Sequence, residues 1–427
     1  MNTSNFGRSG SGRTSGGRPP FRGGYRGASP ARFTHTPSRG TRFGPPRKNF
    51  RGGRGGNFGA QRIDISKFIN KAVITEKTEH FVPEHNFADF AIDSRLKQNI
   101  IAKGYTMPTP IQDRTIPHIL RGSDVVGIAN TGTGKTAAFL IPLINKTLLD
   151  PKSRTLIVVP TRELAIQIDQ EFRGFARNLR LFSACCVGGA GIGQQISALR
   201  HMNHFVIGTP GRLKDLMERK ILNLAGFNSA VLDEADRMLD MGFVNDMRFM
   251  LTRMPAHRQT LFFSATTSRE IDGLIKEFLK APVTISVKTR ETAQGVEQDV
   301  VRVGGGADKL DALHKLLAAP DFTKVLIFGR TKHGVEKLSK ALLARGVRAE
   351  SIHGNKPHGK RQRALSLFKD NHLQVLVATD VAARGLDIAD VSHVINYDIP
   401  ATYEDYVHRI GRTGRGDKKG KALTFIE

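Results

Sequence analysis

The chain has 427 residues, of which 65 are Lys or Arg and 39 are Asp or Glu, so its formal net charge is +26. This length accommodates two or three domains with buried cores, and this charge favours a polyanionic partner. No apolar stretch approaches the roughly 20 residues of a membrane-spanning helix, and the polar, glycine-rich start does not match a cleavable signal. We therefore expect no membrane association.

The two cysteines, Cys185 and Cys186, are adjacent within an apolar run. A disulfide between adjacent cysteines would stabilise the fold little, and the pair matches neither a zinc pattern nor a secreted disulfide framework. We interpret both as packing residues and expect a reducing, cytoplasmic environment.

Residues 1–62 form a tail of distinct composition, with 15 Gly, 13 Lys or Arg, and no acidic residue before Asp64. Arg-Gly-Gly triplets begin at Arg22, Arg51 and Arg54, with Phe and Tyr interleaved. The tail has few branched aliphatic residues to offset chain entropy, so we expect it to be disordered. Arginine and aromatic side chains on a flexible backbone suit contact with single-stranded nucleic acid. A solubilising tail and a transit peptide are the alternatives.

Residues 63–84 are predicted to connect this tail to a first folded domain, residues 85–286. That domain alternates helical periodicity with short β-branched runs, such as Thr155–Val159 and Phe205–Gly208. The alternation predicts an α/β fold in which helices cover both faces of a parallel sheet.

A polar stretch, residues 287–299, is predicted to be a linker to a second α/β domain, residues 300–427. Runs such as Val325–Phe328 and Val375–Ala378 resume the pattern, and Ala422–Glu427 resembles a strand. The second domain has no glycine-rich phosphate loop, which suggests that the two domains complete one shared site.

The phosphate loop lies between the apolar run Asp124–Ile128 and a helix-like run that begins at Ala137. Its free backbone N–H groups and the helix N-terminus favour a phosphate. Lys135 is positioned to reach the outer phosphates, and Thr136 to ligate Mg²⁺. The candidate contacts are Thr131, Gly132, Thr133, Gly134, Lys135 and Thr136.

An acidic tetrad, Asp233–Asp236, closes the apolar run Ser229–Leu232. Carboxylates therefore lie at the C-terminal end of a buried strand, where α/β sheets bind ligands. One carboxylate can hold the metal's water shell and the next can orient an attacking water. An Asp-Glu pair after a strand is common, but together with the phosphate loop it indicates nucleoside triphosphate hydrolysis.

Further motifs follow in a fixed order. They are GYTMPTPIQ at Gly104–Gln112, PTRELA at Pro160–Ala165, TPGRL at Thr209–Leu213, SAT at Ser264–Thr266, ATDVAARGLD at Ala378–Asp387 and HRIGRTGR at His408–Arg415. In this order and spacing the chain resembles the DEAD-box RNA helicases over nearly all of residues 85–427. The sequence of its second domain is most similar to that of the bacterial RhlE-type branch.

The resemblance implies two tandem RecA-like domains and an ATP-dependent RNA helicase with ATP and Mg²⁺ as cofactors. It also implies roles in the nucleotide site. The adenine contacts would be Phe87, Thr109 and Gln112. Asp233 would hold the metal's water shell, and Glu234 would hold the hydrolytic water. Gly385 and Asp387 would lie near the nucleotide, Asp387 at the ribose, and Arg412 and Arg415 would be arginine fingers. Asp236, Ser264, Thr266 and His408 would couple hydrolysis to domain closure.

RNA is the partner that the resemblance implies, gripped by sugar and phosphate rather than by base. The implied contacts are Pro160, Arg162, Gly189, Thr209 and Arg212 in the first domain, and Thr331, Gly354, Arg361 and Thr379 in the second. Backbone contacts carry no base sequence, and 2′-hydroxyl contacts would favour RNA over DNA. Ribosomal or degradation ribonucleoproteins are candidate larger partners.

The chain departs from the family pattern at several positions. Asn130 and Thr133 replace the more usual Gln and Ser of the loop, and Pro357-His358 replaces Ser-Gln before Arg361. Family members usually continue beyond the last strand, so the chain is either truncated or complete without that extension. Two other functions remain open: an ATP-gated RNA clamp or annealing chaperone, and, less favoured by the motifs, a DNA helicase.

Overall fold

The computed structural model describes residues 68–69, 81–130, 132–287, 296–304, 307–383, 388, 390–414 and 420–426. The tail predicted to be disordered, residues 1–62, lies outside the described residues. So does most of the stretch predicted to be a linker.

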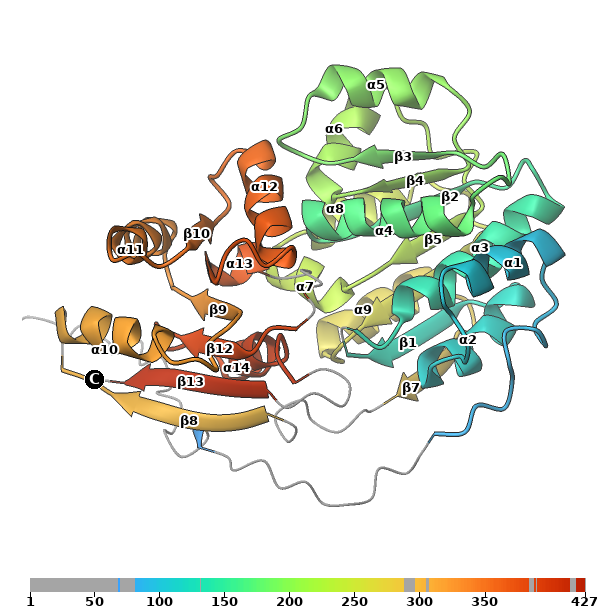
Figure 1. The fold of residues 1–427 in the computed structure, drawn as a ribbon. Coiled ribbons are helices and arrows are strands. Elements are labelled where there is room, and N and C mark those ends of the chain that lie inside the picture. Colours follow the sequence, from blue (N-terminus) through green and yellow to red (C-terminus); the bar gives the residue numbers. More distant parts are fainter. Residues whose placement is uncertain are drawn as a thin grey trace, which may run out of the picture. The chain divides into compact units, whose positions relative to one another are not determined.

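The first domain is built on a seven-stranded sheet with the strand order β3-β4-β2-β5-β6-β1-β7 (Figure 1). All of its strand pairs are parallel. Its strands are β1 (Val125–Ala129), β2 (Thr155–Val158), β3 (Ser183–Cys186), β4 (Phe205–Gly208), β5 (Ser229–Leu232), β6 (Gln259–Ser264) and β7 (Val283–Val287). Its helices are α1 (Ser94–Ala102), α2 (Pro110–Leu120), α3 (Lys135–Leu149), α4 (Arg162–Phe175), α5 (Ile192–Arg200), α6 (Pro210–Glu218), α7 (Ala235–Asp240), α8 (Val244–Leu251) and α9 (Arg269–Phe278).

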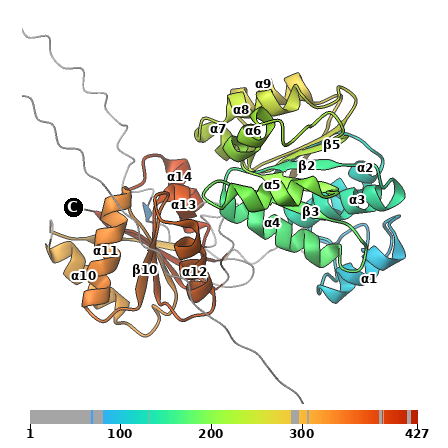
Figure 2. The same ribbon diagram turned by 90° about the horizontal axis from the view of Figure 1, so that it is seen from above.

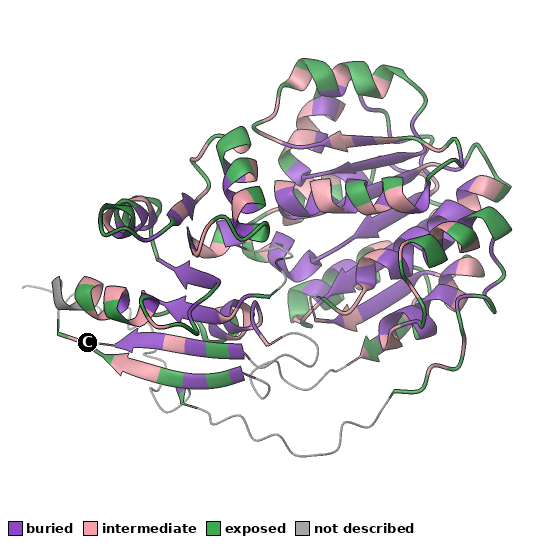
Figure 3. Cartoon of the chain, viewed as in Figure 1, coloured by how far each residue is buried: buried purple, intermediate pink, exposed green. Residues whose placement is uncertain are grey.

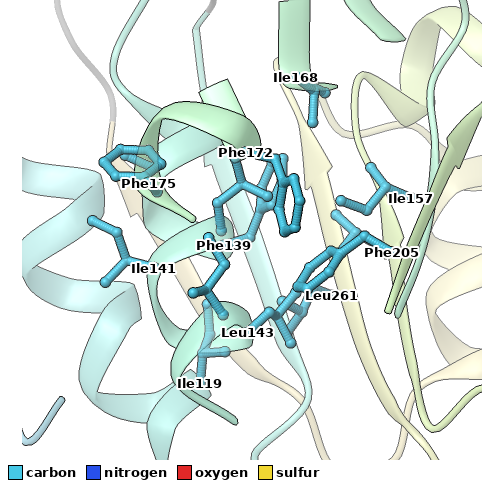
Figure 4. Packing of buried hydrophobic residues seen from close by; sticks show 14 of the residues in the cluster. Ile119, Phe139, Ile141, Leu143, Ile157, Ile168, Phe172, Phe175, Phe205 and Leu261 are labelled. Carbon is cyan, nitrogen blue, oxygen red and sulfur yellow. The ribbon is translucent and has the colours of Figure 1, made fainter. Parts of the chain in front are cut away.

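Successive residues of each central strand enter different cores, because side chains alternate between the two faces of a strand. On β2, Ile157 joins the core that contains Phe139 of α3 and Phe172 of α4 (Figure 4). The preceding residue, Leu156, joins the opposite core, which contains Leu213 of α6 and residues of α8 and α9. Helices therefore cover both faces of the first sheet, as predicted.

The second domain contains a six-stranded parallel sheet with the strand order β10-β11-β9-β12-β13-β8. Its strands are β8 (Val296–Arg302), β9 (Val325–Phe328), β10 (Ala349–Ile352), β11 (Val375–Ala378), β12 (His393–Asn396) and β13 (Gly420–Ile426). Its helices are α10 (Ala307–Leu317), α11 (Lys332–Ala344), α12 (His358–Lys369), α13 (Asp380–Ala383) and α14 (Tyr403–Ile410) (Figure 2).

The second sheet has the same two-sided packing. On β9, Leu326 joins a core with residues of α12 and α14, whereas Ile327 joins a core with residues of α10 and α11. The central strands of both domains are almost entirely buried (Figure 3). The predicted fold class, two parallel-sheet α/β domains, is confirmed.

One predicted boundary differs from the structure. Strand β8 begins at Val296 and pairs along its length with β13, so the second sheet starts inside the stretch 287–299 that was predicted to be a linker. The charged and polar residues of β8 hide the strand in the sequence, because alternate positions of this edge strand are exposed. The terminal strand predicted at Ala422–Glu427 is present as β13.

Candidate active site and nucleic-acid interface

The phosphate loop connects β1 to α3, and its backbone is shaped by glycine. Gly132 and Gly134 have φ angles of 85° and 90°, in the left-handed region that other residues rarely adopt. A side chain on Gly134 would also collide with Gln112, since an added Cβ would lie 2.4 Å from Nε2. Lys135 is the first residue of α3, and its buried ammonium donates to the carbonyl of Ala129 over 2.8 Å. The loop therefore places a lysine and a helix N-terminus together, the arrangement that favours phosphate.

The residues expected at the adenine are fixed to this loop. The hydroxyl of Thr109 donates to the carbonyl of Thr133 over 2.8 Å, and Nε2 of Gln112 donates to that of Gly134 over 3.0 Å. Within α2, Oε1 of Gln112 accepts from the backbone N–H of Thr109. Both residues therefore touch the phosphate loop, 22 or more positions further along the chain. Their role in base recognition stays a prediction.

Phe87 is buried, with its ring edge-on to those of Phe90 and Tyr105 at centroid distances of 6.0 and 5.9 Å. The structure thus places it in the domain core beside α1. Its packing on adenine stays a prediction. Thr131 lies outside the described residues.

The acidic tetrad follows β5, at the same edge of the sheet as the phosphate loop. Asp233 and Glu234 are 2% and 4% exposed. The pKa of Asp233 is raised to about 6, chiefly by burial; the charge of Lys135 opposes the shift and that of Glu234 adds to it. Glu234 has a φ angle of 53°, a strained value for a residue with a side chain, and such strain is concentrated at functional sites. These carboxylates suit Mg²⁺, which keeps several waters and needs only one or two protein carboxylates.

Asp236 links the tetrad to the end of β6. Its Oδ2 accepts hydrogen bonds from the backbone N–H groups of Ala265 and Thr266 and from the hydroxyl of Thr266, at 3.0 to 3.2 Å. Ser264 instead donates to the carbonyl of Thr266 over 2.7 Å. Asp236 therefore contacts Ala265 and Thr266 of the Ser-Ala-Thr segment, but not the hydroxyl of Ser264. The coupling role assigned to these residues stays a prediction.

The strand order divides the carboxyl edge of the first sheet into two halves. The neighbouring strands β5, β6 and β1 lead into the tetrad, the Ser-Ala-Thr segment and the phosphate loop. The neighbouring strands β3, β4 and β2 lead into the residues expected to contact RNA. The sheet thus collects the nucleotide candidates on one side and the RNA candidates on the other, although the two sets alternate along the chain.

On the RNA half, two arginines lie against small residues and backbone. The guanidinium of Arg162, at the start of α4, packs on Gly189, where an added Cβ would lie 2.2 Å from Nη1. Arg212 of α6 donates to Oε1 of Gln195 over 2.9 Å. Thr209 immediately precedes α6, and Pro160 follows β2. The strands bring these residues to one edge, and RNA contact there stays a prediction.

The second domain repeats this arrangement. Thr331 follows β9, Gly354 follows β10 and Thr379 follows β11, and these three strands are neighbours in the sheet. The hydroxyl of Thr331 caps α11 by accepting from the N–H of Gly334 over 3.0 Å. Arg361 lies on α12, which begins at His358 after the unusual Pro357.

Arg412 and His408, two of the second-domain residues to which the resemblance gives a role, line a small pocket. It is lined by Phe328, Asp380, Ala383, Asp405, His408, Arg409 and Arg412. Arg412 is buried, and its Nε donates to the carbonyl of His408 over 3.3 Å. Gly385, Asp387 and Arg415 lie outside the described residues.

Comparison with known proteins identifies the family. A family model described as DEAD/DEAH box helicase matches residues 109–274, and one described as helicase conserved C-terminal domain matches residues 308–417. CshA of Listeria monocytogenes, an ATP-dependent RNA helicase, is 46% identical over 345 residues, which cover 80% of this chain and 66% of CshA. The chain belongs to the DEAD-box helicase family.

Solved structures of DEAD-box proteins share its fold. Saccharomyces cerevisiae Dbp5 bound to RNA and ADP BeF3 is 30% identical, with a TM-score of 0.71 over 80% of this chain and 89% of Dbp5. The DEAD-box helicase Mss116 bound to single-stranded RNA and UDP-BeF is 30% identical, with a TM-score of 0.73 over 81% of this chain and 76% of Mss116. The present chain spans 66% of the length of CshA. The RhlE-type branch stays a prediction.

Two residues of this DEAD-box protein escaped the sequence-based prediction. Arg237 is fully buried and lies 3.3 Å from Oε2 of Glu234. Arg409 makes two hydrogen bonds to Asp380, at 2.6 and 2.8 Å, and a third to the carbonyl of Asp398. Arg237 directly follows the acidic tetrad, and Arg409 lies within the motif His408–Arg415 without a role of its own. Charged residues on short helices normally face solvent, so only the structure reveals that both are buried against Glu234 and Asp380.

No helix among the described residues is long and apolar enough to cross a membrane. Within the same part of the chain, no group of three or more His, Cys, Asp or Glu side chains could hold a metal ion alone. A metal at the tetrad would therefore depend on water and phosphate for most of its ligands.

Proposed function

We propose that this protein is an ATP-dependent RNA helicase, which couples ATP binding and hydrolysis to local unwinding of RNA duplexes and remodelling of RNA–protein complexes. One observation carries the proposal: the strand order collects a phosphate loop and acidic tetrad on one half of the first sheet's carboxyl edge and the RNA candidates on the other half. One sheet would therefore link the proposed nucleotide site to the proposed nucleic-acid site.

We assign ATP to the phosphate loop and Mg²⁺ to Thr136 and Asp233. The metal would neutralise charge on the phosphates. Glu234 would hold the attacking water, and Arg237 keeps the Glu234 carboxylate in place through their 3.3 Å contact. Lys135, whose ammonium now donates to the carbonyl of Ala129, would bind the outer phosphates.

Arg412 and Arg415 complete the proposed site from the second domain. Charge builds on the transferring phosphoryl group, and an arginine placed there lowers the activation free energy by roughly 4–7 kcal/mol. ATP turnover would then require the two domains to close. RNA held by both domains would drive that closure, which makes hydrolysis dependent on RNA.

RNA is favoured over DNA because the grip is through the backbone. Small residues such as Gly189 and Gly354, with backbone N–H groups and threonine hydroxyls, suit sugars and phosphates. Contacts to 2′-hydroxyls would provide the discrimination. Recognition of this kind leaves the choice of RNA sequence to other parts, and we propose ribosomal or degradation ribonucleoproteins as the wider setting.

The cysteines support a reducing compartment, which we take to be the cytoplasm. Burial raises the pKa of Cys185 and of Cys186 to about 12. Both thiols therefore stay protonated and pack in the core instead of reacting.

The proposal is tested by the steady-state ATPase rate of the whole chain alone, with single-stranded RNA and with single-stranded DNA of the same sequence. We expect stimulation by RNA and little by DNA. Equal rates under all three conditions would leave a nucleotide hydrolase without an RNA function.

A further inference from the structure

Phe68 occupies an unexpected place in the molecule. It precedes the whole first domain in the sequence, yet it is fully buried in a core of the second domain. Its ring lies 4.7 Å from that of Tyr406, centroid to centroid, with the ring planes at 60°. The next residue, Ile69, is 50% exposed. Phe68 and Ile69 are drawn as the short blue segment beside β8 in Figure 1. The side chain of Phe68 is therefore inserted into the core of the second domain, whereas that of the neighbouring Ile69 is half exposed.

The socket around Phe68 is formed by the second domain. Val296 of β8 and Ile410 of α14 belong to the same buried cluster as Phe68 and Tyr406. Tyr406 is itself fully buried, and its hydroxyl donates to Oε1 of Gln298, a buried residue of β8, over 2.9 Å. Burial raises the pKa of Tyr406, so the phenol stays neutral and keeps this bond. The bond fixes the tyrosine ring, and the ring presents a rigid aromatic surface to Phe68.

We propose that Phe68 is an anchor that fastens the basic N-terminal tail to the second domain. The tail precedes the first domain in the sequence, but in this arrangement its attachment point lies on the sheet formed by β8 to β13. RNA captured by the tail would then be delivered from the second domain. The occupant of the socket is this chain's own segment, because Phe68 is seated in it.

The anchor also creates a second connection between the two domains. Fewer than 20 residues separate Phe68 from Phe87 at the start of the first domain. Extended, such a stretch spans at most roughly 65 Å. The domains are therefore joined both by the covalent stretch between β7 and β8 and by this docked segment. The docked connection can be released without breaking the chain, which makes it a reversible limit on domain separation.

A cleavage experiment on the whole protein tests the anchor directly. A specific protease site inserted between residues 75 and 76 allows the tail to be cut from the remaining chain. After cleavage, gel filtration at about 0.5 M salt, where purely ionic contacts are screened, measures whether the tail fragment stays bound. We expect it to co-elute with residues 76–427. Separate elution of the cut tail fragment with Phe68 unchanged would overturn the proposal.

Two variants show whether Phe68 is responsible. Truncating a buried phenylalanine that fills a socket weakens its docking by about 100-fold or more, so Phe68→Ala should release the cut fragment. Ile69→Ala, which removes a half-exposed side chain next to it, should retain the fragment. Equal retention of the fragment by both variants would contradict an anchor at Phe68.

A competition experiment on the cleavable protein needs no substitution at the anchor. A synthetic peptide of residues 60–75 should displace the tail fragment from the cut wild-type protein. The same peptide carrying Phe68→Ala should not. Failure of the wild-type peptide at concentrations well above that of the protein, or equal displacement by both peptides, would overturn the proposal. These readouts do not involve ATP or RNA, so they stand apart from the helicase assignment.

Discussion

The side-chain amide of Gln112 donates a hydrogen bond to the carbonyl of Gly134 over 3.0 Å. This bond joins the residue expected to read adenine to the loop expected to hold the phosphates. Gln112 is 1% exposed, so its amide would otherwise be left unsatisfied in the core. The shape of the phosphate loop therefore depends on the same side chain that we propose to recognise the base.

Gln112→Ala should reduce both the use of ATP and the preference for ATP over GTP. The variant lacks the amide that we propose to hydrogen-bond the edge of adenine, and the carbonyl of Gly134 loses its hydrogen bond from Gln112. The measurement is kcat/KM for ATP and for GTP in the presence of RNA. Gln374→Ala is a matched control, because Nε2 of Gln374 makes two similar bonds to the carbonyls of Leu317 and Phe322. A Gln112→Ala protein that still strongly prefers ATP would place base recognition elsewhere.

Glu234→Gln should retain binding of ATP while hydrolysis falls by orders of magnitude. The amide preserves the shape beside Arg237 but is a far weaker base for the attacking water. Nucleotide binding by fluorescence and single-turnover hydrolysis separate the two effects. Glu277→Gln, at an exposed ion pair with Arg248, is the control and should leave both unchanged. Near-normal turnover by Glu234→Gln would remove this residue from the mechanism.

Asp233→Asn should stabilise the nucleotide-free protein and abolish its ATPase activity. The folded pKa of Asp233 is raised from 3.8 to about 6, so the buried charge costs stability above pH 6, by about 3 kcal/mol at most. The cost falls as the pH drops below 6, because the folded protein then takes up the proton, and it vanishes below the unfolded pKa. Asp233→Asn should accordingly raise the free energy of unfolding, measured with urea, more at pH 8 than at pH 5.

The matched control is Asp311→Asn, at an exposed carboxylate that pairs with Arg345. It should change the free energy of unfolding by no more than about 1 kcal/mol. Destabilisation by Asp233→Asn at pH 8 would mean that the attraction of Lys135 outweighs the cost of burial.

Arg412→Ala should abolish the stimulation of ATP hydrolysis by RNA while RNA binding persists. The expected loss is about 10³-fold or more, the range found for arginine fingers. Arg345→Ala, a surface arginine of the same domain, should leave the stimulated rate unchanged. Retention of most of the RNA-stimulated rate by Arg412→Ala would exclude it as a finger.

Deleting residues 1–62 should raise the RNA concentration needed for half-maximal ATPase while the rate at saturating RNA stays nearly unchanged. A disordered chain of this length would reach roughly 40–50 Å. The tail's contacts should be ionic, because residues 1–62 include 13 Lys or Arg and no acidic residue. The dependence of log affinity on log salt should flatten by about 0.7 for each lost phosphate contact on a single strand. An unchanged half-saturation concentration at low and moderate salt would reduce the tail to a solubility device. The deletion keeps Phe68, so it does not test the anchor.

The sheets of both domains could be predicted because their signals are local. The runs Phe205–Gly208, Val325–Phe328 and Val375–Ala378 are strands with the same bounds in the structure, since each is a short buried run between turn signals. Strand β8 was missed because its exposed residues, Glu297, Asp299 and Arg302, are charged, a pattern that a linker shares.

The nucleotide residues were predictable from motif spacing, but their mutual contacts were not. The bonds from Thr109 and Gln112 to the phosphate loop join positions more than 20 residues apart, and no local pattern encodes them. The burial of Phe68 is a still longer-range event. Ile65, Phe68, Ile69 and Ala72 have the spacing of one helix face, but such a pattern does not say which domain the segment packs on. Only the completed second domain shows where Phe68 docks.

A helicase couples ATP turnover to RNA strand separation. The decisive measurement is release of one strand from a short RNA duplex by excess protein under single-turnover conditions. We expect release with ATP, little release without nucleotide, and none beyond background for Arg412→Ala. ATP-dependent binding without release of a strand, or faster annealing of the strands, would contradict helicase activity and leave an ATP-gated clamp or annealing chaperone.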